Sequence, residues 1–443
     1  AVSAAKTKGD TPMPRKRIPP TAKIDNEINE LKYSLGQDDK PKAVLDKLVD
    51  LGMRRIIQEI LEKEVQEYIG QAYYKHSDTR NGHRNGYEPS DLKTAEGRLT
   101  IERPQVRDAA VPFESATWNN IKKKTEHLEK MAVEMYVRGC STRDIEDLLK
   151  DEQGRILLSK STVSELNEVL WKQYEEFCRR DLKDFDVVYI FIDAVYEPLR
   201  LTKSRQEAIL VVSGILSGGE KVLLSIRHGN KESYENCLEV FRDLKKRNMC
   251  DPVLGVSDGA PGLIRAFEEV LHKTLRQRCL FHKKGNILSK VPQEAHSQMK
   301  IDLNAVYYAS NTESAYRNAE IFRKTYKLDY PSAVKCFDDD LDACLQHLKC
   351  PAKHRRRITT TNSLERIFGE ENRRSKVIPR YFTEKSGLKL IYATLIRSSQ
   401  RWQKIRITFD EQAKIMALRY QLGHDAIKEQ NIKSKTTKKT YAL

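Results

Sequence analysis

The sequence lacks any run of 18 or more apolar residues, and no apolar segment follows the basic residues at its start. The first absence argues against a membrane-spanning helix, and the second against a secretory signal. The eight cysteines are scattered without paired spacing, which argues against a disulfide framework and is typical of a reducing compartment. We therefore expect a cytoplasmic protein without a membrane partner.

Acidic residues are also few relative to basic ones. The chain has 79 Lys and Arg against 63 Asp and Glu, a net charge of +16, which predicts a polyanionic partner. Residues 1–20 and 426–443 each carry a net charge of +4, although a charged tail is often only a solvated one. Two internal stretches, 272–290 and 353–380, are also strongly basic.

The first 180 residues show mainly helical patterning. Proline-rich residues 1–21 are predicted to be disordered, and a Gly/Asn-rich break at 81–86 precedes an alternating segment at 96–106, which predicts a strand. Two short helices then follow, "STRDIEDLL" and "SKSTVSELNEVL", joined through a glycine. This pattern predicts a helix-turn-helix whose second helix opens with Ser159, Lys160 and Ser161, although an ordinary helical hairpin has the same pattern.

From residue 187 to residue 281 the elements follow the order β-β-β-α-β-α-β. Strands are predicted at 187–195, 207–216, 221–228, 252–257 and 275–281, and helices at 234–247 and 263–272. A strand hairpin followed by crossover units predicts a mixed sheet with helices packed on it, and hence an α+β fold.

Two aspartates belong to this predicted sheet. Asp193 lies within the apolar strand "VVYIFIDAVY", where an ionised carboxylate is costly unless it is paired, and Asp258 follows the fourth strand. If strands one and four are neighbours, the two carboxylates lie close together, and a divalent cation such as Mg²⁺ would relieve their repulsion. The alternative is that Asp193 faces water and Asp258 merely starts a turn.

A third candidate carboxylate is Glu365 in "TTTNSLERIFGEENRR". Asn362 can cap the helix that follows, so Glu365 is also open to interpretation as the glutamate of a capping box. Glu370 and Glu371 lie five and six residues further on and point to other faces of the helix, so we expect only one of the three to join the site.

Lysine, arginine, cysteine and histidine residues lie close in sequence to these carboxylates. We expect phosphate contacts from the following residues: Lys283, Lys284, Arg355, Arg356, Arg357, Arg373 and Arg374. Cys279 and His282 invite a zinc interpretation, but a structural zinc site needs four ligands. On a straight strand, residues three apart face opposite sides. We therefore expect Cys279 to be buried in the sheet and His282 to lie at the strand end near the site.

Four segments carry a resemblance to a known family: "VYIFIDAVY", "GVSDGAPGLIRAF", "RQRCLFHKKGNIL" and "TTNSLERIFGEENRRSKVI". In this order they resemble the Mutator-type DDE transposases of bacterial insertion sequences, and the resemblance spans about residues 40–420. It implies a ribonuclease-H-like fold with a catalytic triad of Asp193, Asp258 and Glu365 that holds two Mg²⁺ ions, for which Mn²⁺ is expected to substitute. Cys279, His282 and Asn362 would then support the site. The chain departs from the family at Gly259-Ala260-Pro261, where the family often has Ala-His.

The resemblance also implies an organisation and a function. The expected parts are a basic arm (1–21), an N-terminal helical and short β region for dimerisation and DNA binding (22–115), a helix-turn-helix-like region (116–182), the first part of the catalytic domain (183–292), a helical insertion (293–352), the second part of the catalytic domain (353–425) and a basic tail (426–443). The expected protein is a bacterial, nucleoid-associated homodimer that cuts transposon ends in double-stranded DNA and joins the 3′-OH to target DNA. A domesticated, catalytically silent DNA-binding protein and a plain ribonuclease-H-like nuclease are the alternatives.

Overall fold

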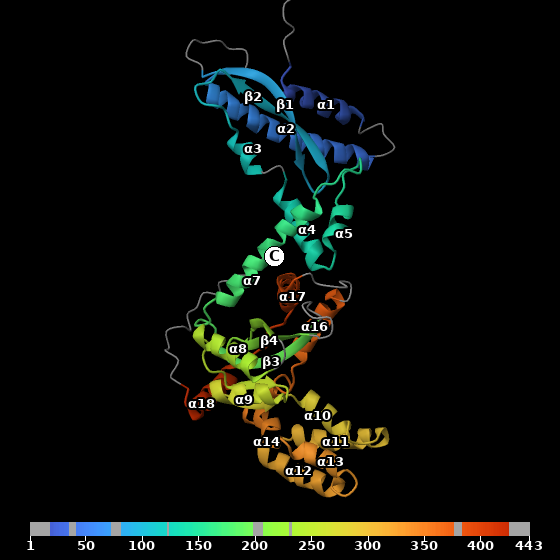
Figure 1. Cartoon of the computed structure of the whole chain (residues 1–443), viewed down its shortest axis with the longest axis vertical. Helices are drawn as coiled ribbons and strands as arrows, with labels where there is room; N and C mark the ends of the chain where they lie inside the picture. The colour runs from blue at the N-terminus through green and yellow to red at the C-terminus, as the bar shows by residue number, and fades with distance from the viewer. Residues whose placement is uncertain are drawn as a thin grey trace, which may run out of the picture. The chain divides into compact units, whose positions relative to one another are not determined.

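The computed structural model describes residues 18–34, 41–71, 81–121, 124–197, 207–229, 233–375 and 383–424. The predicted basic tail, and all but the end of the predicted basic arm, lie outside these ranges. The chain forms two compact units, one of residues 1–133 and 142–166 and the other of residues 134–141 and 167–443 (Figure 1). Among the described residues, no helix is long and apolar enough to cross a bilayer.

The N-terminal unit is built on two helices and a hairpin. Helices α1 (Pro20–Ser34) and α2 (Pro41–Ile69) pack together, and α2 also contacts the antiparallel pair β1 (His83–Lys93) and β2 (Arg98–Arg107). Its small core consists of the buried side chains Leu61, Leu92, Leu99, Ile101 and Trp118. Trp118 belongs to the short helix α3 (Ala116–Ile121).

Strand β1 was not predicted, because the Gly/Asn-rich residues 81–86 at its start were interpreted as a break. The strand accommodates those residues because the register shifts between Arg84 and Tyr87, and Gly86 takes a positive φ of 82° at that irregularity. Pro89 pairs with Glu102 in a two-stranded sheet, where every strand is an edge and a missing N–H is tolerated.

Helices α4 (Glu126–Val137), α5 (Thr142–Leu148) and α6 (Lys160–Leu166) follow. Helices α5 and α6 contact each other, as a helix-turn-helix requires. Their connection is longer than a usual turn, and it is ordered by hydrogen bonds from the backbone and side chain of Arg155 to the Asp151 carboxylate, both 2.8 Å long.

The second unit contains a five-stranded mixed sheet in the order β5-β4-β3-β6-β7. Its strands are β3 (Val187–Glu197), β4 (Glu207–Leu216), β5 (Lys221–Gly229), β6 (Leu254–Ser257) and β7 (Leu275–Arg278). Strand β4 pairs antiparallel with both β3 and β5, whereas β6 and β7 run parallel to β3. The predicted α+β class and mixed sheet are confirmed.

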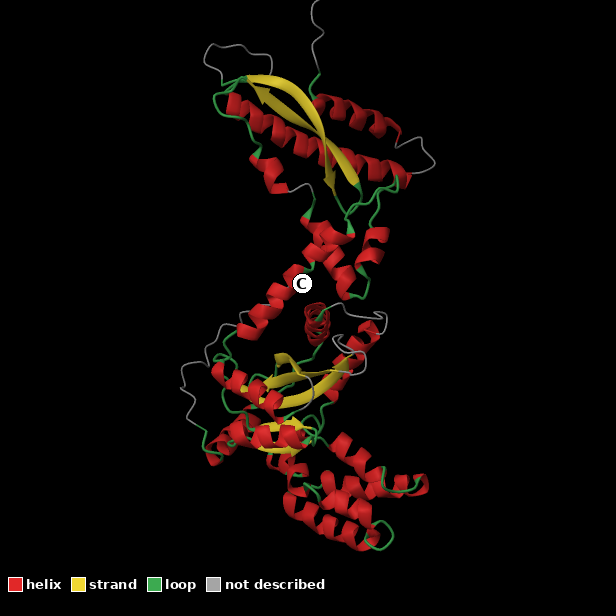
Figure 2. Cartoon of the chain, viewed as in Figure 1, coloured by secondary structure: helices red, strands yellow, loops and turns green. Residues whose placement is uncertain are grey.

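Helices enclose this sheet on both faces (Figure 2). Helices α8 (Tyr234–Lys246) and α9 (Pro261–Val270) bury one face against Ile190 and Ile192. The opposite face packs on α7 (Glu168–Arg179), α16 (Asn362–Ser375), α17 (Glu384–Ser399) and α18 (Phe409–Gln421), and contributes Tyr189, Phe191 and Val195 to their core. Because side chains alternate along a strand, Asp193 belongs to the face that α16 covers.

A helical segment with its own core separates β7 from α16. It consists of α10 (Leu280–Leu288), the 3-10 turn η1 (Gln293–Ala295), α11 (His296–Tyr307), α12 (Thr312–Tyr326), α13 (Pro331–Asp338), α14 (Leu341–Cys344), the 3-10 turn η2 (Gln346–Lys349) and α15 (Ala352–Arg355). Arg276 on β7 anchors it through an ion pair with Asp340, in which Nη1 and Oδ2 lie 2.8 Å apart.

Candidate active site

The sheet register brings two carboxylates to neighbouring positions. Strands β3 and β6 pair in parallel with Ile192 opposite Ser257, and the next residues along the two strands are Asp193 and Asp258. Parallel neighbours in register lie about 4.8 Å apart, so Asp193, within β3, and Asp258, directly after β6, lie side by side. The expectation that the first and fourth predicted strands are adjacent is confirmed.

The surroundings of Asp193 oppose its ionisation. Burial raises its pKa from 3.8 to about 7, and the nearby Asp258 adds to the rise. The backbone N–H of Ala194, which donates to Oδ1 over 2.9 Å, favours the ionised form, as do His282 and the Thr361 hydroxyl. Without a further cation, Asp193 therefore holds its proton close to neutral pH.

A cationic side chain lies against the backbone that follows Asp258. A Cβ placed on Gly259 would come within 0.8 Å of Nη1 of Arg278, so the guanidinium occupies the space that only a glycine leaves open. The Nε of Arg278 is buried and has no hydrogen-bond partner among the described residues. Sequence reasoning missed Arg278, although it lies at the end of a strand next to the aspartates.

Cys279 is buried and His282 lies near Asp193, as predicted, but the structure corrects the predicted strand that carries them. Strand β7 ends at Arg278 and α10 begins at Leu280, so Cys279 takes the N-cap position and His282 lies in the first helical turn. The two side chains therefore do not face opposite sides. The Cys279 sulfur, a His282 ring nitrogen and a Glu365 carboxylate oxygen all lie within 4.8 Å of one another.

His282 carries a positive charge in this cluster. The Cys279 thiol, followed by the carboxylates of Asp193 and Glu365, raises the pKa of His282 to about 9 against the opposing effect of burial. Nε2 of His282 lies 3.9 Å from Oε1 of Glu365. Burial opposes ionisation of the Cys279 thiol, but His282 and the backbone at Thr361 outweigh it and lower the pKa of that thiol.

Glu365 reaches the cluster from α16, and the alternative in which Asn362 caps this helix is wrong. The helix begins at Asn362, and the carbonyl of Thr361 accepts the first bonds, from the backbone N–H groups of Leu364 (2.7 Å) and Glu365 (3.1 Å). Thr361 thus takes the cap position. Its Oγ1 lies 3.4 Å from Oε1 of Glu365 and 3.6 Å from the sulfur of Cys279.

The rival carboxylates lie elsewhere. Glu370 pairs with Arg373 over 2.9 Å, and Glu371 is buried. In the part of the chain that the structure describes, the cluster with metal-ligand spacing is Cys279, His282 and Glu365 rather than the three carboxylates. His282 interacts with both Asp193 and Glu365 and partly neutralises them.

Three of the predicted phosphate contacts are engaged with the protein. Lys283 is buried, with its Nζ donating to the carbonyl of Asp339. Lys284 donates to Oδ1 of Asn304 over 3.1 Å and lies over the ring of Tyr308. Arg355 donates to the carbonyls of Ser310, Leu348 and Cys350. Its guanidinium is therefore less available to DNA than those of the other predicted arginines.

The other predicted contacts lie nearer to solvent. Arg356, Arg357 and Arg373 are exposed, and Arg374 donates to the carbonyl of Arg138. In the N-terminal unit, Lys160 and Ser161 are exposed at the start of α6. Ser159 precedes that helix, and its Oγ lies 2.9 Å from Oγ of Ser161 and 3.0 Å from Oγ1 of Thr162.

Comparison with known proteins gives a consistent result. The family model described as "Transposase, Mutator family" matches residues 26–405. The chain is 33% identical over 272 residues to the transposase for insertion sequence element IS6120 of Mycolicibacterium smegmatis, covering 61% of this chain and 84% of that protein. It is 26% identical over 389 residues to the transposase for IS256 in transposon Tn4001 of Staphylococcus aureus, covering 86% and 95%. The matched range includes both aspartates, the Cys279–His282 pair and Glu365, and the chain belongs to the Mutator family of transposases.

Proposed function

We propose that this chain is the transposase of a bacterial insertion sequence, which hydrolyses one strand at a transposon end and then uses the exposed 3′-OH to attack DNA. The observation that carries the proposal is the pairing of Ile192 with Ser257, which makes Asp193 and Asp258 neighbours on a sheet whose same face is covered by α16, the helix of Glu365. A mixed sheet enclosed by helices, with a helical insertion before that helix, supports a ribonuclease-H-like fold.

The donor set fits a divalent cation. A buried carboxyl whose pKa is about 7 beside a second carboxylate is a site that a cation would stabilise, and oxygen donors suit Mg²⁺. Asp193, Asp258 and Glu365 would hold two Mg²⁺ ions, with Mn²⁺ as the expected substitute. When bound, such ions activate the attacking oxygen and stabilise the leaving oxygen of a phosphodiester.

The chain's own residues prepare this chemistry. The protonated His282 holds Asp193 and Glu365 together against their mutual repulsion, and the Thr361 hydroxyl orients Glu365. Arg278, Arg356 and Arg357 supply positive charge for the phosphates of the DNA strand. Because water and the 3′-OH attack directly, no serine, tyrosine or cysteine nucleophile is needed.

The partners follow from the reaction. The substrates are double-stranded DNA at the transposon ends and at the target, with α5 and α6 as the helix-turn-helix and Ser159, Lys160 and Ser161 at the DNA. Two ends must be processed together, which favours a homodimer. We place the protein at the bacterial nucleoid, in the cytoplasm.

The test is cleavage of a labelled duplex that carries the inverted repeat found beside the gene. With Mg²⁺, the wild-type chain is expected to cleave it, whereas Asp193→Asn, Asp258→Asn and Glu365→Gln lose at least a hundredfold in rate. Glu370→Gln is the matched comparison on the same helix, and it should cleave at close to the wild-type rate.

Two outcomes would count against the proposal. If Asp193→Asn cleaves as fast as the wild-type chain, the assignment of the three carboxylates is wrong. If the wild-type chain binds the repeat but never cleaves it with Mg²⁺ or Mn²⁺, the catalytically silent alternative is correct.

A further inference from the structure

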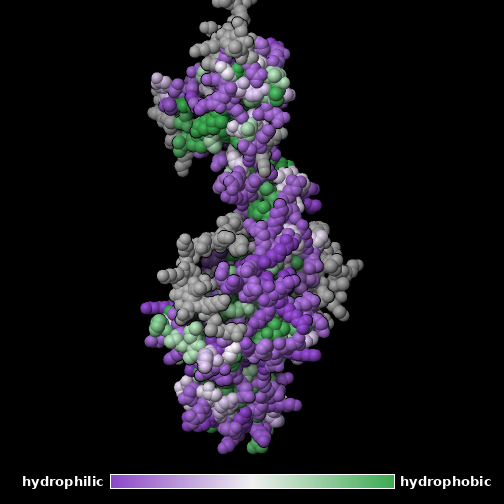
Figure 3. Space-filling view, turned by 90° about the vertical axis from the view of Figure 1, so that its left-hand side faces the viewer, coloured by the Kyte–Doolittle hydropathy of each residue, from purple (hydrophilic) through white to green (hydrophobic). Residues whose placement is uncertain are grey.

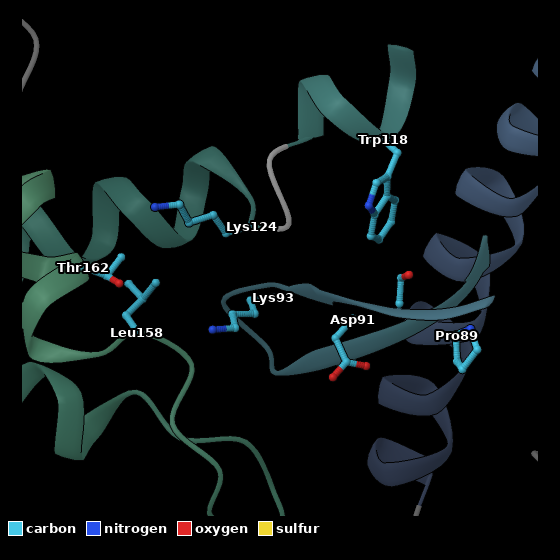
Figure 4. A pocket seen from close by; sticks show the side chains of 8 residues that line it. Pro89, Asp91, Lys93, Trp118, Lys124, Leu158 and Thr162 are labelled. Atoms are coloured by element: carbon cyan, nitrogen blue, oxygen red, sulfur yellow. The ribbon is translucent and has the colours of Figure 1, made fainter. Parts of the chain in front are cut away.

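The N-terminal unit contains a pocket of about 480 Å³ that no part of the proposed reaction uses. Three segments line it: the β1 strand, the stretch of α3 and the residues after it, and the start of α6 (Figure 4). The lining residues are Pro89, Ser90, Asp91, Lys93, Trp118, Lys124, Leu158 and Thr162. All belong to one compact unit.

A buried donor faces this pocket without an acceptor. Trp118 is only 3% exposed, and its indole N–H has no hydrogen-bond partner among the described residues. Figure 4 shows the nitrogen edge of the indole turned toward the side of the pocket where Lys93 and Lys124 lie. Because a buried donor is costly when it is left unpaired, this N–H calls for an acceptor that enters the pocket.

The charged side chains that line the pocket are Asp91, Lys93 and Lys124, and Lys124 forms an ion pair with Glu129 over 2.9 Å. Burial, followed by repulsion from Arg98 and Lys124, lowers the pKa of Lys93. Asp91, the carboxylate that lines the pocket, acts to raise the pKa of Lys93, but its oxygens are engaged by Arg98 and by Thr100, each over 2.9 Å. Among the described residues no carboxylate forms an ion pair with Lys93, so a bound anion would relieve the repulsion.

We propose that this pocket binds a phosphate group of the DNA backbone, with Lys93 and the indole N–H of Trp118 as its principal donors. The proposal rests on the DNA-binding role proposed above for α6, because Thr162 of the pocket belongs to the same helix as Lys160 and Ser161. The hydroxyls of Ser90 and Thr162 add donors. A phosphate held here fixes the register of α6 on the duplex and carries no sequence information itself.

The experiment measures binding of the full chain to a fluorescent transposon-end duplex over a series of salt concentrations. Each phosphate contact that is lost lowers the slope of log K against log salt by about 0.9. Lys93→Gln is expected to lose this amount, whereas Lys93→Arg keeps it. Trp118→Phe, which retains the ring but not the N–H, should weaken binding severalfold. Lys47→Gln, an exposed lysine of α2 outside the pocket, is the matched control and should leave the slope unchanged.

A Lys93→Gln slope equal to the wild-type slope overturns the proposal. Inorganic phosphate is titrated in parallel against the melting temperature of wild-type and Lys93→Gln chains. Stabilisation by phosphate with an unchanged duplex slope would mean that the pocket binds free anions and not DNA, which also overturns it. If the wild-type chain binds no end duplex at all, the DNA-binding role fails, and the proposal fails with it.

A separate observation concerns the outer face of α2. One face of this helix is buried through Val44, Leu51, Leu61, Val65 and Ile69. The opposite face carries Leu45, Val49, Ile56 and Ile60, which are 56, 50, 60 and 45% exposed. At 100° per residue these four lie within one narrow stripe, which we call the α2 stripe. Gly52 belongs to it as well, and a Cβ added there would meet nothing within 4 Å.

The spacing of the α2 stripe is self-complementary. Leu45 and Ile60 lie equally far in sequence from the point between Gly52 and Met53. Val49 and Ile56 are centred on the same point. In an antiparallel pair of α2 helices related by a two-fold axis at that midpoint, Leu45 meets Ile60 of the second copy and Val49 meets Ile56. Gly52 lies near the axis, where its missing side chain allows the helices to approach closely.

The area suits such a pairing. Four side chains with roughly 100 Å² exposed each give ~400 Å² of apolar surface per copy, about half of the ~800 Å² that each partner contributes to a standard interface. The polar residues beside the stripe supply the remainder. In the view of Figure 3, hydrophobic surface gathers in a patch on the N-terminal unit and in further patches on the rest of that side. We infer that the α2 stripe binds a second copy of this chain, which specifies the homodimer of the proposed function.

The test is the mass of the full chain in solution, measured by sedimentation equilibrium. Val49→Glu and Ile56→Lys should each shift the chain to monomer, because each buries an unpaired charge. An equimolar mixture of the two should recover a dimer, since residue 49 of one copy meets residue 56 of the other. Leu328→Lys, at a 90% exposed position in the helical insertion, should leave the dimer intact.

Retention of the dimer by both single variants overturns the inference. A mixture that stays monomeric, while each variant melts like the wild-type chain, overturns the antiparallel register. A monomeric wild-type chain that still cleaves single ends overturns the dimer but leaves the proposed chemistry in place.

Discussion

Replacing Asp193 by asparagine is expected to stabilise the metal-free protein while abolishing end cleavage. Asp193 is a half-buried carboxyl on an apolar strand, and burial raises its pKa to about 7. Asparagine has nearly the same shape, can still accept the hydrogen bond from the backbone N–H of Ala194, and carries no charge to bury. The active site would thus be a place where the fold gives up stability for function.

The magnitude follows from proton linkage. Below about pH 4 the carboxyl is protonated in both the folded and the unfolded chain and costs nothing. Between pH 4 and 7 the unfolded chain ionises while the folded chain keeps its proton, so the free energy of unfolding falls as pH rises through this window. Above pH 7 the difference between 3.8 and about 7 amounts to roughly 4 kcal/mol, at 1.36 kcal/mol per pKa unit. We expect Asp193→Asn to recover about 2–4 kcal/mol.

The assay is urea denaturation of the wild-type chain and of Asp193→Asn from pH 4 to 8 in EDTA, and again with Mg²⁺. The free energy of unfolding of the wild-type chain should fall relative to that of the variant as pH rises. Mg²⁺ should reduce this difference, because it binds only the native wild-type site. Asp329→Asn, at an exposed position, is the control and should follow the wild-type curve. A variant that is less stable than the wild-type chain at pH 8 in EDTA would refute the reasoning.

Three further predictions concern other residues of the second unit. Gly219→Ala should lower stability by about 1–3 kcal/mol in urea denaturation, because Gly219 has a φ of 88° and its Cβ would lie 1.8 Å from the carbonyl oxygen of Ile405; Gly218→Ala, which meets only the Glu220 carboxylate, should cost less. Arg276→Ala removes the largely buried partner of Asp340 and should cost about 2–3 kcal/mol, seen as earlier protease cleavage within residues 280–355; unchanged protection would show that the pair does not anchor the insertion. Gly259→Ala should displace the Arg278 guanidinium and slow end cleavage at an almost unchanged melting temperature; a full cleavage rate would remove Arg278 from the site.

The sheet was predictable because its signals are local. The apolar strand around Asp193, the Ser217–Glu220 turn and the amphipathic helix at 234–247 each specify an element without reference to the rest of the chain. β1 was missed because its Gly86 and Pro89 suggest a break, and only pairing with β2 makes them part of a strand. Propensity gives way to tertiary context at such edges.

The sequence identified most residues of the candidate site but not how their side chains lie relative to one another. Asp193 and Asp258 could be placed together because parallel pairing is a strong constraint. The position of His282 depended on where β7 ends, a boundary that sequence patterns locate only to within a few residues. Ending the strand at Arg278 instead of Phe281 changes His282 from a side chain opposite Cys279 to one beside it. The sequence did not indicate a role for Arg278, because its position depends on Gly259, nineteen residues earlier in the chain.

The candidate site lies where backbone hydrogen bonds join three distant segments. The N–H of Cys279 donates to the carbonyl of Ser257 over 2.7 Å, and that of Leu280 donates to the carbonyl of Thr359 over 2.8 Å. These bonds connect the strand before Asp258 to the start of α10, and α10 to the segment before Glu365. Asp193 and Asp258 are held by the sheet, and Glu365 by α16, which packs directly on β3 and α17. The start of α10 is therefore bonded through its backbone both to the strand that precedes Asp258 and to the segment that precedes Glu365, which explains how residues more than 80 positions apart in sequence form one cluster.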